Sequence, residues 1–492
     1  MNLQNSQIMP ALIDEVTHNV RQLLTGLLDQ DFEGNIESLS SHGVDALSRG
    51  FHRCLLEAGR LGLERYIQSF ESDEPSLEVD GERWHRSETS KKDFLTMLGE
   101  ITLIRGLYYK RGESHKGKQK ALVPLDRAWD MQERYATPDV VEGLLCASVS
   151  LSPVETAGLF AKLTGISPST SLIYNVIQKD GKRLKECVAA HEKERWEKIR
   201  VPDNAEVIVF SADGANVCLR EAGCKRGRPA ERPLNDETSP ESAYRNVMVG
   251  ALSTYQTNEV SDTTGETQWK PERISSHYLA EMPEQGFGTF RERSVNALKQ
   301  LRSQFPESGI TKLLIMDGAR NLWHWAREES CFEDFDWLLD FYHASEHLSL
   351  LAEALFGKQS TAAKKWYRKW RNKLKHKENA VEGLIRSIDY HIKTRKLSAS
   401  RRKTSEREKN FFINNQEQMN YAIYVELGYP IGSGPVESAC KTIVKERLCR
   451  SGMRWNRESG GNVLNLRVLA KSQQWAQMWS LYRDKHWELE AA

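Results

Sequence analysis

Over most of its first two hundred residues, the chain places apolar side chains three and four positions apart, which is the period of an amphipathic helix. Residues 11–70 contain two such stretches, and residues 138–180 contain a further series. Between them, residues 94–112 are rich in β-branched and aromatic side chains around two glycines, which predicts a β-hairpin. The pattern therefore predicts a helical N-terminal region, residues 1–137, that includes one hairpin.

Residues 138–200 contain a pair of short helices with clear start and stop signals. Ser152 and Glu155 flank Pro153 as a capping box, and Gly165 ends the first helix. A second helix over 168–178 then completes the outline of a helix-turn-helix, although paired short helices also occur in α-rich proteins of other kinds. The side chains that we expect to reach DNA base edges are Ser169, Thr170 and Asn175.

From residue 201 onward, short apolar runs typical of buried strands replace the helical pattern. They predict a mixed α/β unit formed by residues 201–344 and 426–492, with a basic helical insertion over 345–425. The predicted strands are 206–210, 245–255, 273–282, 312–316 and 337–343, with a helix over 290–305. The fold class is thus a multidomain α+β and α/β protein with a helical N-terminal half.

Three carboxylates stand out in this second half. Two predicted strands end in Asp-Gly, at Asp213 and Asp317, and Glu437 lies in a helix just after Gly-Ser-Gly. If the strands are neighbours, the two aspartates face one point and repel each other unless a cation lies between them. Such a trio suits Mg²⁺ or Mn²⁺ and in-line phosphoryl transfer. The alternative is that each aspartate forms a turn and that Glu437 only pairs with Lys441.

A near-neutral net charge of +1 hides a strong separation along the chain. Residues 1–50 carry −5, residues 441–471 carry +6, and residues 358–410 carry eighteen basic and five acidic side chains, or +13. A block this one-sided indicates contact with a polyanion, although a solvated helical face is the alternative. Trp366 and Trp370 share one helical face and should pack inside the insertion. The expected phosphate contacts are Lys373, Lys375 and Lys377.

Composition excludes several classes of protein. Hydrophobic residues make up 39% and charged residues 28% of the 492, and no apolar run approaches the ~18 residues of a membrane helix. The start of the chain has neither a basic nor an apolar signal segment, and the eight cysteines never form CxxC. We therefore expect a cytoplasmic protein in a reducing compartment, without a membrane partner.

Four blocks, in order over roughly residues 200–480, resemble the DDE transposases of bacterial insertion sequences, specifically the Kra type. They are SADGANV at 211–217, LLIMDGARNLWHWA at 313–326, DFYHASEHL at 340–348 and GYPIGSGPVESACKTIVKERLCRSGMRW at 428–455. The resemblance implies a ribonuclease-H-like catalytic domain with a mostly helical insertion before the glutamate. The cysteine-rich patch that relatives often carry near the N-terminal hairpin is missing from residues 108–117.

By motif position, the resemblance implies that Asp213, Asp317 and Glu437 are the metal-binding catalytic triad. It also implies that Asp340 and His343 form a supporting Asp-x-x-His pair. Within the last block, the residues that we expect to contact DNA are Lys441, Arg450, Arg454 and Trp455.

The favoured function is a transposase that binds the terminal repeats of its element, cleaves DNA with Mg²⁺ or Mn²⁺, and joins the freed 3′-OH to target DNA. The need to hold two DNA ends predicts a homodimer or larger oligomer. One alternative is a metal-dependent nuclease or resolvase that cuts without strand transfer. Another is a domesticated DNA-binding protein without catalysis, against which the intact triad argues. Inverted repeats that flank the coding sequence would separate a transposase from a nuclease.

Overall fold

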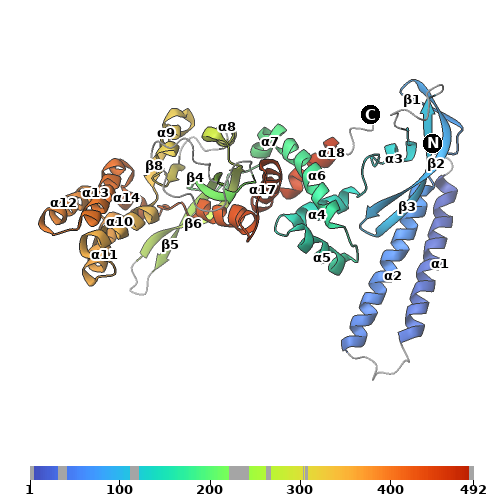
Figure 1. The fold of residues 1–492 in the computed structure, drawn as a ribbon, viewed down its shortest axis with the longest axis horizontal. Helices are drawn as coiled ribbons and strands as arrows, with labels where there is room; N and C mark the ends of the chain where they lie inside the picture. Colours follow the sequence, from blue (N-terminus) through green and yellow to red (C-terminus); the bar gives the residue numbers. More distant parts are fainter. Residues whose placement is uncertain are drawn as a thin grey trace. The chain divides into compact units, whose positions relative to one another are not determined.

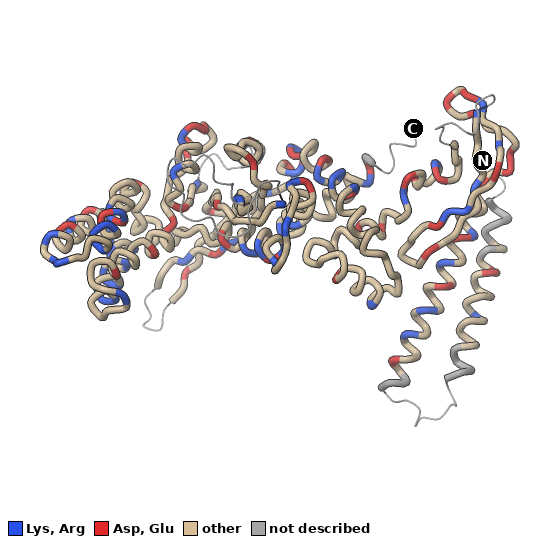
Figure 2. The backbone as a smooth tube through the Cα atoms, in the orientation of Figure 1, with Lys and Arg blue, Asp and Glu red and all other residues tan. Residues whose placement is uncertain are grey.

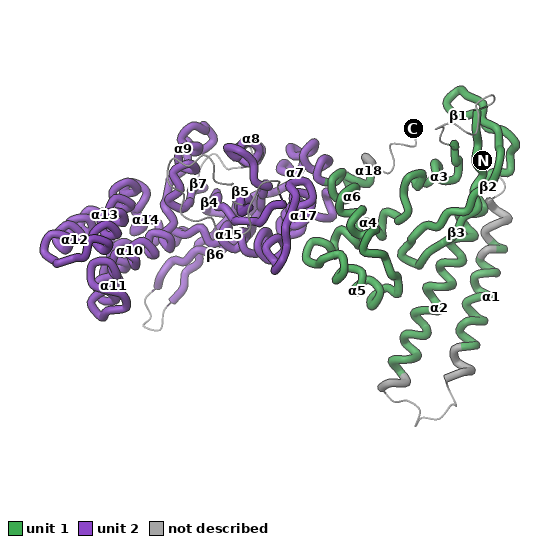
Figure 3. Tube along the Cα trace, in the orientation of Figure 1, with its two compact units in different colours: residues 1–184, 479–492 green, residues 185–478 purple. Residues whose placement is uncertain are grey.

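The structure is a computed structural model that describes residues 5–31, 41–110, 121–220, 243–261, 267–302, 304 and 309–486. The chain divides into two compact units (Figure 3). The first comprises residues 1–184 and 479–492, and the second comprises residues 185–478. Within the described segments, no helix has both the length and the apolar character needed to cross a membrane.

The first unit begins with two long helices that pack against each other, and the second of them lies against a small antiparallel sheet (Figure 1). Gln68, near the end of the second helix, donates to and accepts from the backbone of Ile104 in the sheet, so the sheet is fixed to the helix. The strand order is β1-β2-β3. The elements are α1 (Asn5–Asp31), α2 (Ser41–Gln68), β1 (Ser76–Val79), β2 (Glu82–Thr96) and β3 (Gly99–Lys110).

The predicted hairpin is therefore part of a three-stranded sheet. Its turn lies at residues 97–98, and its first strand starts twelve residues earlier than predicted, at Glu82 rather than Phe94. That missed part of β2 is rich in charged side chains and mostly exposed or half-buried, so no run of apolar residues marks it in the sequence. The pairing of its backbone with β3, rather than its side chains, makes it a strand.

The paired helices after residue 137 form as their capping signals predict. The Ser152 side chain accepts from the Glu155 N–H while the Glu155 side chain accepts from the Ser152 N–H, and Gly165 ends α5 with a φ of 75°. The next helix is longer than predicted and runs to Ala190. The elements are α3 (Pro124–Ala128), α4 (Pro138–Ser148), α5 (Pro153–Thr164), α6 (Thr170–Ala190) and, at the other end of the chain, α18 (Trp475–His486).

The second unit is built on a five-stranded mixed sheet of order β6-β5-β4-β7-β8. The first three strands along the chain pair in antiparallel fashion, and β7 and β8 add to β4 in parallel. The inner strands are almost continuously apolar because helices cover both faces of the sheet. The strands are β4 (Val207–Cys218), β5 (Tyr244–Ser261), β6 (Thr267–Glu281), β7 (Thr311–Met316) and β8 (Asp336–Leu339).

Different helices cover the two faces of this sheet. On one face Phe210 of β4 contacts Trp325 of α9 and Phe332 of η3, while α8 lies over Gly250 of β5. The opposite face meets the C-terminal helices, because Cys440 of η5 contacts the β4 residue Asp213. The elements of these layers are α7 (Glu192–Glu197), η2 (Gln285–Phe287), α8 (Gly288–Arg302), α9 (Arg320–Glu328), η3 (Ser330–Phe332), α15 (Gly434–Ala439), η5 (Cys440–Lys445), α16 (Glu446–Leu448) and α17 (Arg457–Lys471).

Between β8 and α15 the chain makes a helical excursion from residue 341 to residue 426. Trp366 and Trp370 are buried within it, which confirms that they pack inside the insertion. Lys and Arg residues recur along α11, α12 and α13 (Figure 2), and their side chains are exposed or partly exposed. The helices are α10 (Phe341–Phe356), α11 (Thr361–His376), α12 (Ala380–Thr394), α13 (Ala399–Asn414), η4 (Gln416–Gln418) and α14 (Tyr421–Glu426).

The predicted strand over 337–343 is wrong in its second half. The strand ends at Leu339, and Asp340 caps the N-terminus of α10 by accepting from the N–H groups of Tyr342 and His343. An apolar run does not separate a buried strand from the buried first turn of a helix, and here the capping carboxylate decides the boundary.

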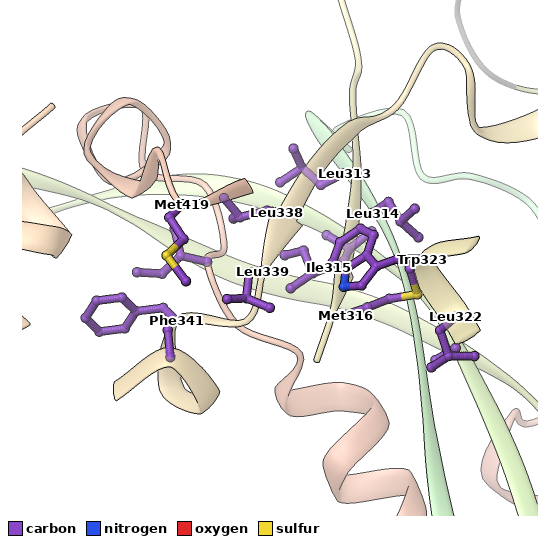
Figure 4. Close-up of a cluster of buried hydrophobic side chains, with 14 of the residues drawn as sticks. Leu313, Leu314, Ile315, Met316, Leu322, Trp323, Leu338, Leu339, Phe341 and Met419 are labelled. Atoms are coloured by element: carbon purple, nitrogen blue, oxygen red, sulfur yellow. The ribbon is translucent and has the colours of Figure 1, made fainter. Parts of the chain in front are cut away.

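One apolar cluster joins the sheet to the helical excursion (Figure 4). Ile315 and Met316 of β7 are fully buried, Trp323 of α9 lies beside Met316, and Leu339 of β8 lies near Phe341 of α10. The excursion therefore shares its core with the sheet and is not an independently packed appendage.

Replacing Ile315 with alanine should lower the free energy of unfolding of the second unit by about 2–5 kcal/mol, because the fully buried β7 side chain would leave a cavity. Urea unfolding followed by tryptophan fluorescence would measure the change. The matched control is Leu350→Ala on α10, a residue that is 47% exposed, and it should change stability by about 0.5 kcal/mol or less. Equal losses in both variants would contradict the assignment of β7 to the core.

Candidate active site

Parallel pairing of β4 with β7 places two aspartates side by side. The pairs run in register from Val207 with Thr311 to Phe210 with Leu314. Continued for three residues beyond the last pair, this register sets Asp213 level with Asp317, which directly follows β7, and the charge of Asp213 does act on Asp317. This juxtaposition is the one that the two Asp-Gly motifs predict.

Asp213 does not end its strand, which corrects the sequence-based interpretation. The strand continues to Cys218 because β5 stays paired with it, with Val249 opposite Asp213. Asp213 Oδ1 accepts from the Gly214 N–H at 2.6 Å, and Oδ2 accepts from the buried Cys440 thiol at 3.6 Å. The carboxylate is thus held on the face of the sheet that the C-terminal helices cover.

Asp317 directly follows β7, as predicted, and is only partly exposed. Its Oδ1 accepts from the Ala319 N–H at 3.0 Å. Burial raises the pKa of Asp317, and the negative charge of Asp213 adds to this, whereas the Ala319 hydrogen bond and His343 oppose it. Burial is the larger cause of the raised pKa, and the part that comes from Asp213 indicates that the charge of Asp213 reaches Asp317.

Glu437 lies in the first turn of α15, and its side chain is exposed. Partial desolvation and the charges of Asp340 and Asp213 raise its pKa, so Glu437 lies within electrostatic reach of the β4 aspartate. Glu437 forms no salt bridge with Lys441 in the described structure, so pairing with Lys441 does not account for this glutamate. The π-helical segment η5 follows α15 directly, and such segments occur often at functional sites.

Asp340 fixes the loop that precedes Glu437. Its carboxylate is fully buried and accepts from four donors, namely the N–H groups of Tyr342 and His343 and both the N–H and the hydroxyl of Ser433. The neighbouring Phe341 N–H donates to the Ile431 carbonyl at 3.0 Å. With all its bonds made inside the protein, Asp340 is placed to position the site rather than to bind a ligand.

His343 belongs to a hydrogen-bonded chain that reaches α13. Its Nε2 lies 3.2 Å from Nε2 of His347, and His347 Nδ1 is bonded to the buried carboxylate of Glu408. Burial raises the pKa of Glu408, but the hydrogen bonds of His347 and Arg407 outweigh it and hold that pKa below its usual value. The Phe411 ring stacks on His347 with ring centroids 3.6 Å apart. The hydrogen-bonded chain therefore ties α10, whose His343 acts electrostatically on Asp317, to α13 within the helical excursion.

The carboxylates have the chemistry that a hard divalent cation requires, since all their donor atoms are oxygens. Among the described residues, however, no group of three or more His, Cys, Asp or Glu side chains is arranged so that it could hold a metal ion. The structure thus pairs two aspartates and brings Glu437 within electrostatic reach of Asp213, without a complete ligand set.

The residues of the last block that we expect to contact DNA differ in their exposure and in the hydrogen bonds that they make within the protein. Lys441 is exposed on η5, and Arg454 is partly exposed. Arg450 is partly exposed, and its Nε donates to the Glu446 carbonyl at 3.0 Å. Trp455 has a structural role: its indole N–H donates to the Leu448 carbonyl at 2.9 Å, and its backbone bridges to the end of β4.

The other predicted DNA contacts lie on helices in both units. Ser169, Thr170 and Asn175 are exposed at the start of α6, and Ser169 caps this helix by accepting from the Leu172 N–H at 3.1 Å. At the end of α11, Lys377 is exposed and Lys375 partly exposed. The Lys373 ammonium lies 4.9 Å from the centre of the buried Trp370 ring. All of these side chains reach the surface, and their contacts with DNA stay predictions.

Several residues of the site have no clear signal in the sequence. His347 follows His343 by one helical turn, which is a detectable spacing, but Glu408 lies 61 residues beyond His347. Ser433 donates to Asp340, and Cys440 donates to Asp213. Only the folding of the chain brings these residues together. Contacts this distant along the chain need the three-dimensional arrangement to be found.

No protein-family model and no curated protein matches the chain. Among solved structures, the chain is similar to the Drosophila P element transposase strand transfer complex, at 11% identity over 71% of this chain and 81% of the other. The TM-score of 0.24 is too low to establish a common fold.

Asp317→Asn should make the metal-free protein at least as stable as the wild type at pH 8. The raised pKa means that ionisation of Asp317 favours the unfolded chain, so the wild type loses stability as pH rises through the folded-state pKa. Asparagine keeps an oxygen for the Ala319 N–H. The advantage of the variant should shrink at pH 5, as measured by urea unfolding.

Asp334→Asn is the control, for which we expect the opposite change in the free energy of unfolding. Lys312 and Arg302 hold the pKa of Asp334 below its usual value despite its partial burial, so its ionised form stabilises the fold. This variant should be less stable than the wild type at both pH values. A loss in Asp317→Asn as large as that in Asp334→Asn would show that the aspartate pair is not under electrostatic repulsion.

Proposed function

We propose that this protein is a DDE transposase that cleaves DNA and transfers DNA strands. One observation carries the proposal: Asp213 on β4 and Asp317 just after the neighbouring parallel strand β7 lie within electrostatic reach of each other, and Glu437 from a distant helix lies within reach of Asp213. These are the three carboxylates that the resemblance to the transposases of insertion sequences implies.

The architecture of the second unit supports a ribonuclease-H-like catalytic domain. A mixed sheet holds Asp213 on its central strand, and the helices α10–α14 interrupt the domain before Glu437. A mostly helical insertion at this point is what the resemblance implies.

Asp213 and Asp317, with Glu437, would hold Mg²⁺ or Mn²⁺, and the bound cation would supply charge stabilisation for phosphoryl transfer. The roles of the surrounding residues follow from their contacts. Asp340 holds the Ser433 loop so that Glu437 stays near the pair. Cys440 and the Gly214 N–H orient the Asp213 carboxylate from two sides.

DNA binding is assigned to two regions. The exposed start of α6 suits recognition of the terminal repeats, and the basic helices α11–α13 suit contacts with phosphates (Figure 2). Two DNA ends have to be held together for transposition, so we propose that the active form is a homodimer or a larger oligomer.

Asp213→Asn, Asp317→Asn and Glu437→Gln should each reduce cleavage of terminal-repeat DNA by orders of magnitude, because each removes a charge that the transition state requires. Binding of the same DNA should persist, since it depends on other surfaces. The measurement is cleavage of a labelled duplex in Mg²⁺ or Mn²⁺ beside a binding assay in chelator. In the wild type alone, Mn²⁺ should also raise the melting temperature, which reports cation binding without catalysis.

Glu382→Gln is the matched control, because Glu382 is an exposed carboxylate on α12 whose known partner is Arg386. It should cleave like the wild type. If Glu437→Gln stays active while both aspartate variants are dead, the third ligand is misassigned, and Glu446 or Glu426 becomes the next candidate. Full activity in all three site variants would refute the transposase assignment.

Replacing Lys373, Lys375 and Lys377 with alanine should weaken binding to DNA of any sequence. Each lost phosphate contact should reduce the slope of log affinity against log salt by about 0.9. Lys373 should contribute least, because its ammonium already lies over Trp370. A slope equal to that of the wild type would mean that the end of α11 is only a solvated surface.

A further inference from the structure

A cavity of about 610 Å³ opens beside Asp317, and the carboxylate site does not account for it. It lies between the end of β7, α9 and α13, with Gly318 in its lining. A Cβ at Gly318 would come within 2.6 Å of the Phe411 ring, so a larger residue there would displace the ring that lines the cavity. The lining thus begins one residue from a proposed catalytic carboxylate.

The lining combines positive charge with amide groups and contains no acidic side chain. It includes the arginines Arg320, Arg327 and Arg407 and the asparagines Asn410, Asn414 and Asn415. Arg407 is already bonded to Glu408. In the described structure, Arg320 and Arg327 have no carboxylate partner, and the Arg327 guanidinium lies 5.7 Å from the centre of the Trp337 ring. Two uncompensated charges therefore border the cavity.

Two aromatic side chains complete the lining. Phe411 is partly exposed, and Trp323 is buried and stacks on Trp337 with ring centroids 5.7 Å apart. The Trp323 indole N–H is buried without a hydrogen-bond partner in the described structure. A site that offers guanidinium groups, amides and a ring face suits a ligand that has a phosphate, polar edges and a flat ring.

We propose that this cavity holds an unpaired nucleotide of the DNA strand next to the scissile phosphate. The volume accommodates a base with its sugar and phosphate, since small-ligand sites are typically about 300–1,000 Å³. A paired base cannot present its hydrogen-bonding edge to the asparagines while its face meets Phe411, so the nucleotide has to leave the duplex. This inference rests on the proposed DNA function and adds that the DNA strand at the site has a nucleotide that is not base-paired.

The test compares the full-length protein bound to two labelled duplexes in chelator, one blunt and one with a few unpaired nucleotides at its end. The wild type should bind the overhang duplex about fivefold or more tightly than the blunt one. Arg320→Gln with Arg327→Gln should abolish this preference and lower the salt slope for the overhang by about 0.7 for each lost contact. Asn414→Leu, which keeps the branched shape of the side chain but removes its amide without changing charge, should abolish the preference as well.

The matched control is Arg386→Gln with Arg402→Gln, which removes two charges from exposed positions on α12 and α13 outside the cavity lining. It should keep the preference. Circular dichroism melts confirm that each variant is folded. The proposal would be overturned if the cavity variants and the control variant reduced the affinity for both duplexes equally. That result would mean that the arginines contribute only nonspecific electrostatic attraction to DNA.

Two further results would also overturn it. One is a wild type that binds both duplexes equally. The other is that the wild type binds free deoxyadenosine monophosphate and the cavity variants do not, while all of them bind the duplexes with equal affinity. That result would assign the cavity to a free nucleotide. Because the assay contains no divalent cation, it is independent of cleavage. An overhang preference together with active triad variants would refute the catalytic assignment and leave the cavity standing.

Discussion

Parallel pairing of β4 with β7 is the constraint on which the candidate site depends. The two strands are separated by about a hundred residues, yet their register sets Asp213 and Asp317 at equal positions beyond Phe210 and Leu314. A shift of one residue would turn one carboxylate to the other face of the sheet. The buried side chains of both strands oppose such a shift, so the apolar core enforces an arrangement of charges that repel each other.

Much of the second unit could be predicted because its strands are short apolar runs bounded by glycine and charged residues. Each of the five strands overlaps a predicted one, although β4, β5 and β6 are longer and β8 is shorter than predicted, and the two Asp-Gly motifs lie on β4 and directly after its neighbour β7. The capping box at Ser152 likewise predicts the start of α5. These features are local, and the side-chain pattern that encodes each of them lies within a few residues.

Other features were missed for physical reasons that differ from place to place. The charged first half of β2 becomes a strand only because β1 and β3 pair with it. The sequence pattern predicts that the strand continues beyond Leu339, because the first turn of the helix that follows contains buried residues like those of the strand. His343 and His347 are one helical turn apart, but the contact of His347 with Glu408 joins two helices, and no spacing along the sequence signals it.

Asp340 and Ser433 are 93 residues apart, and their hydrogen bonds, with that from Phe341 to Ile431, join the two ends of the helical excursion at its base. Everything between them is therefore a closed loop whose stem is fixed beside Glu437. The entropy of closing a loop grows only with the logarithm of its length. Helices could then be added to or removed from the excursion over evolutionary time with little effect on the glutamate, provided that the stem and the part of the core it shares with the sheet are kept.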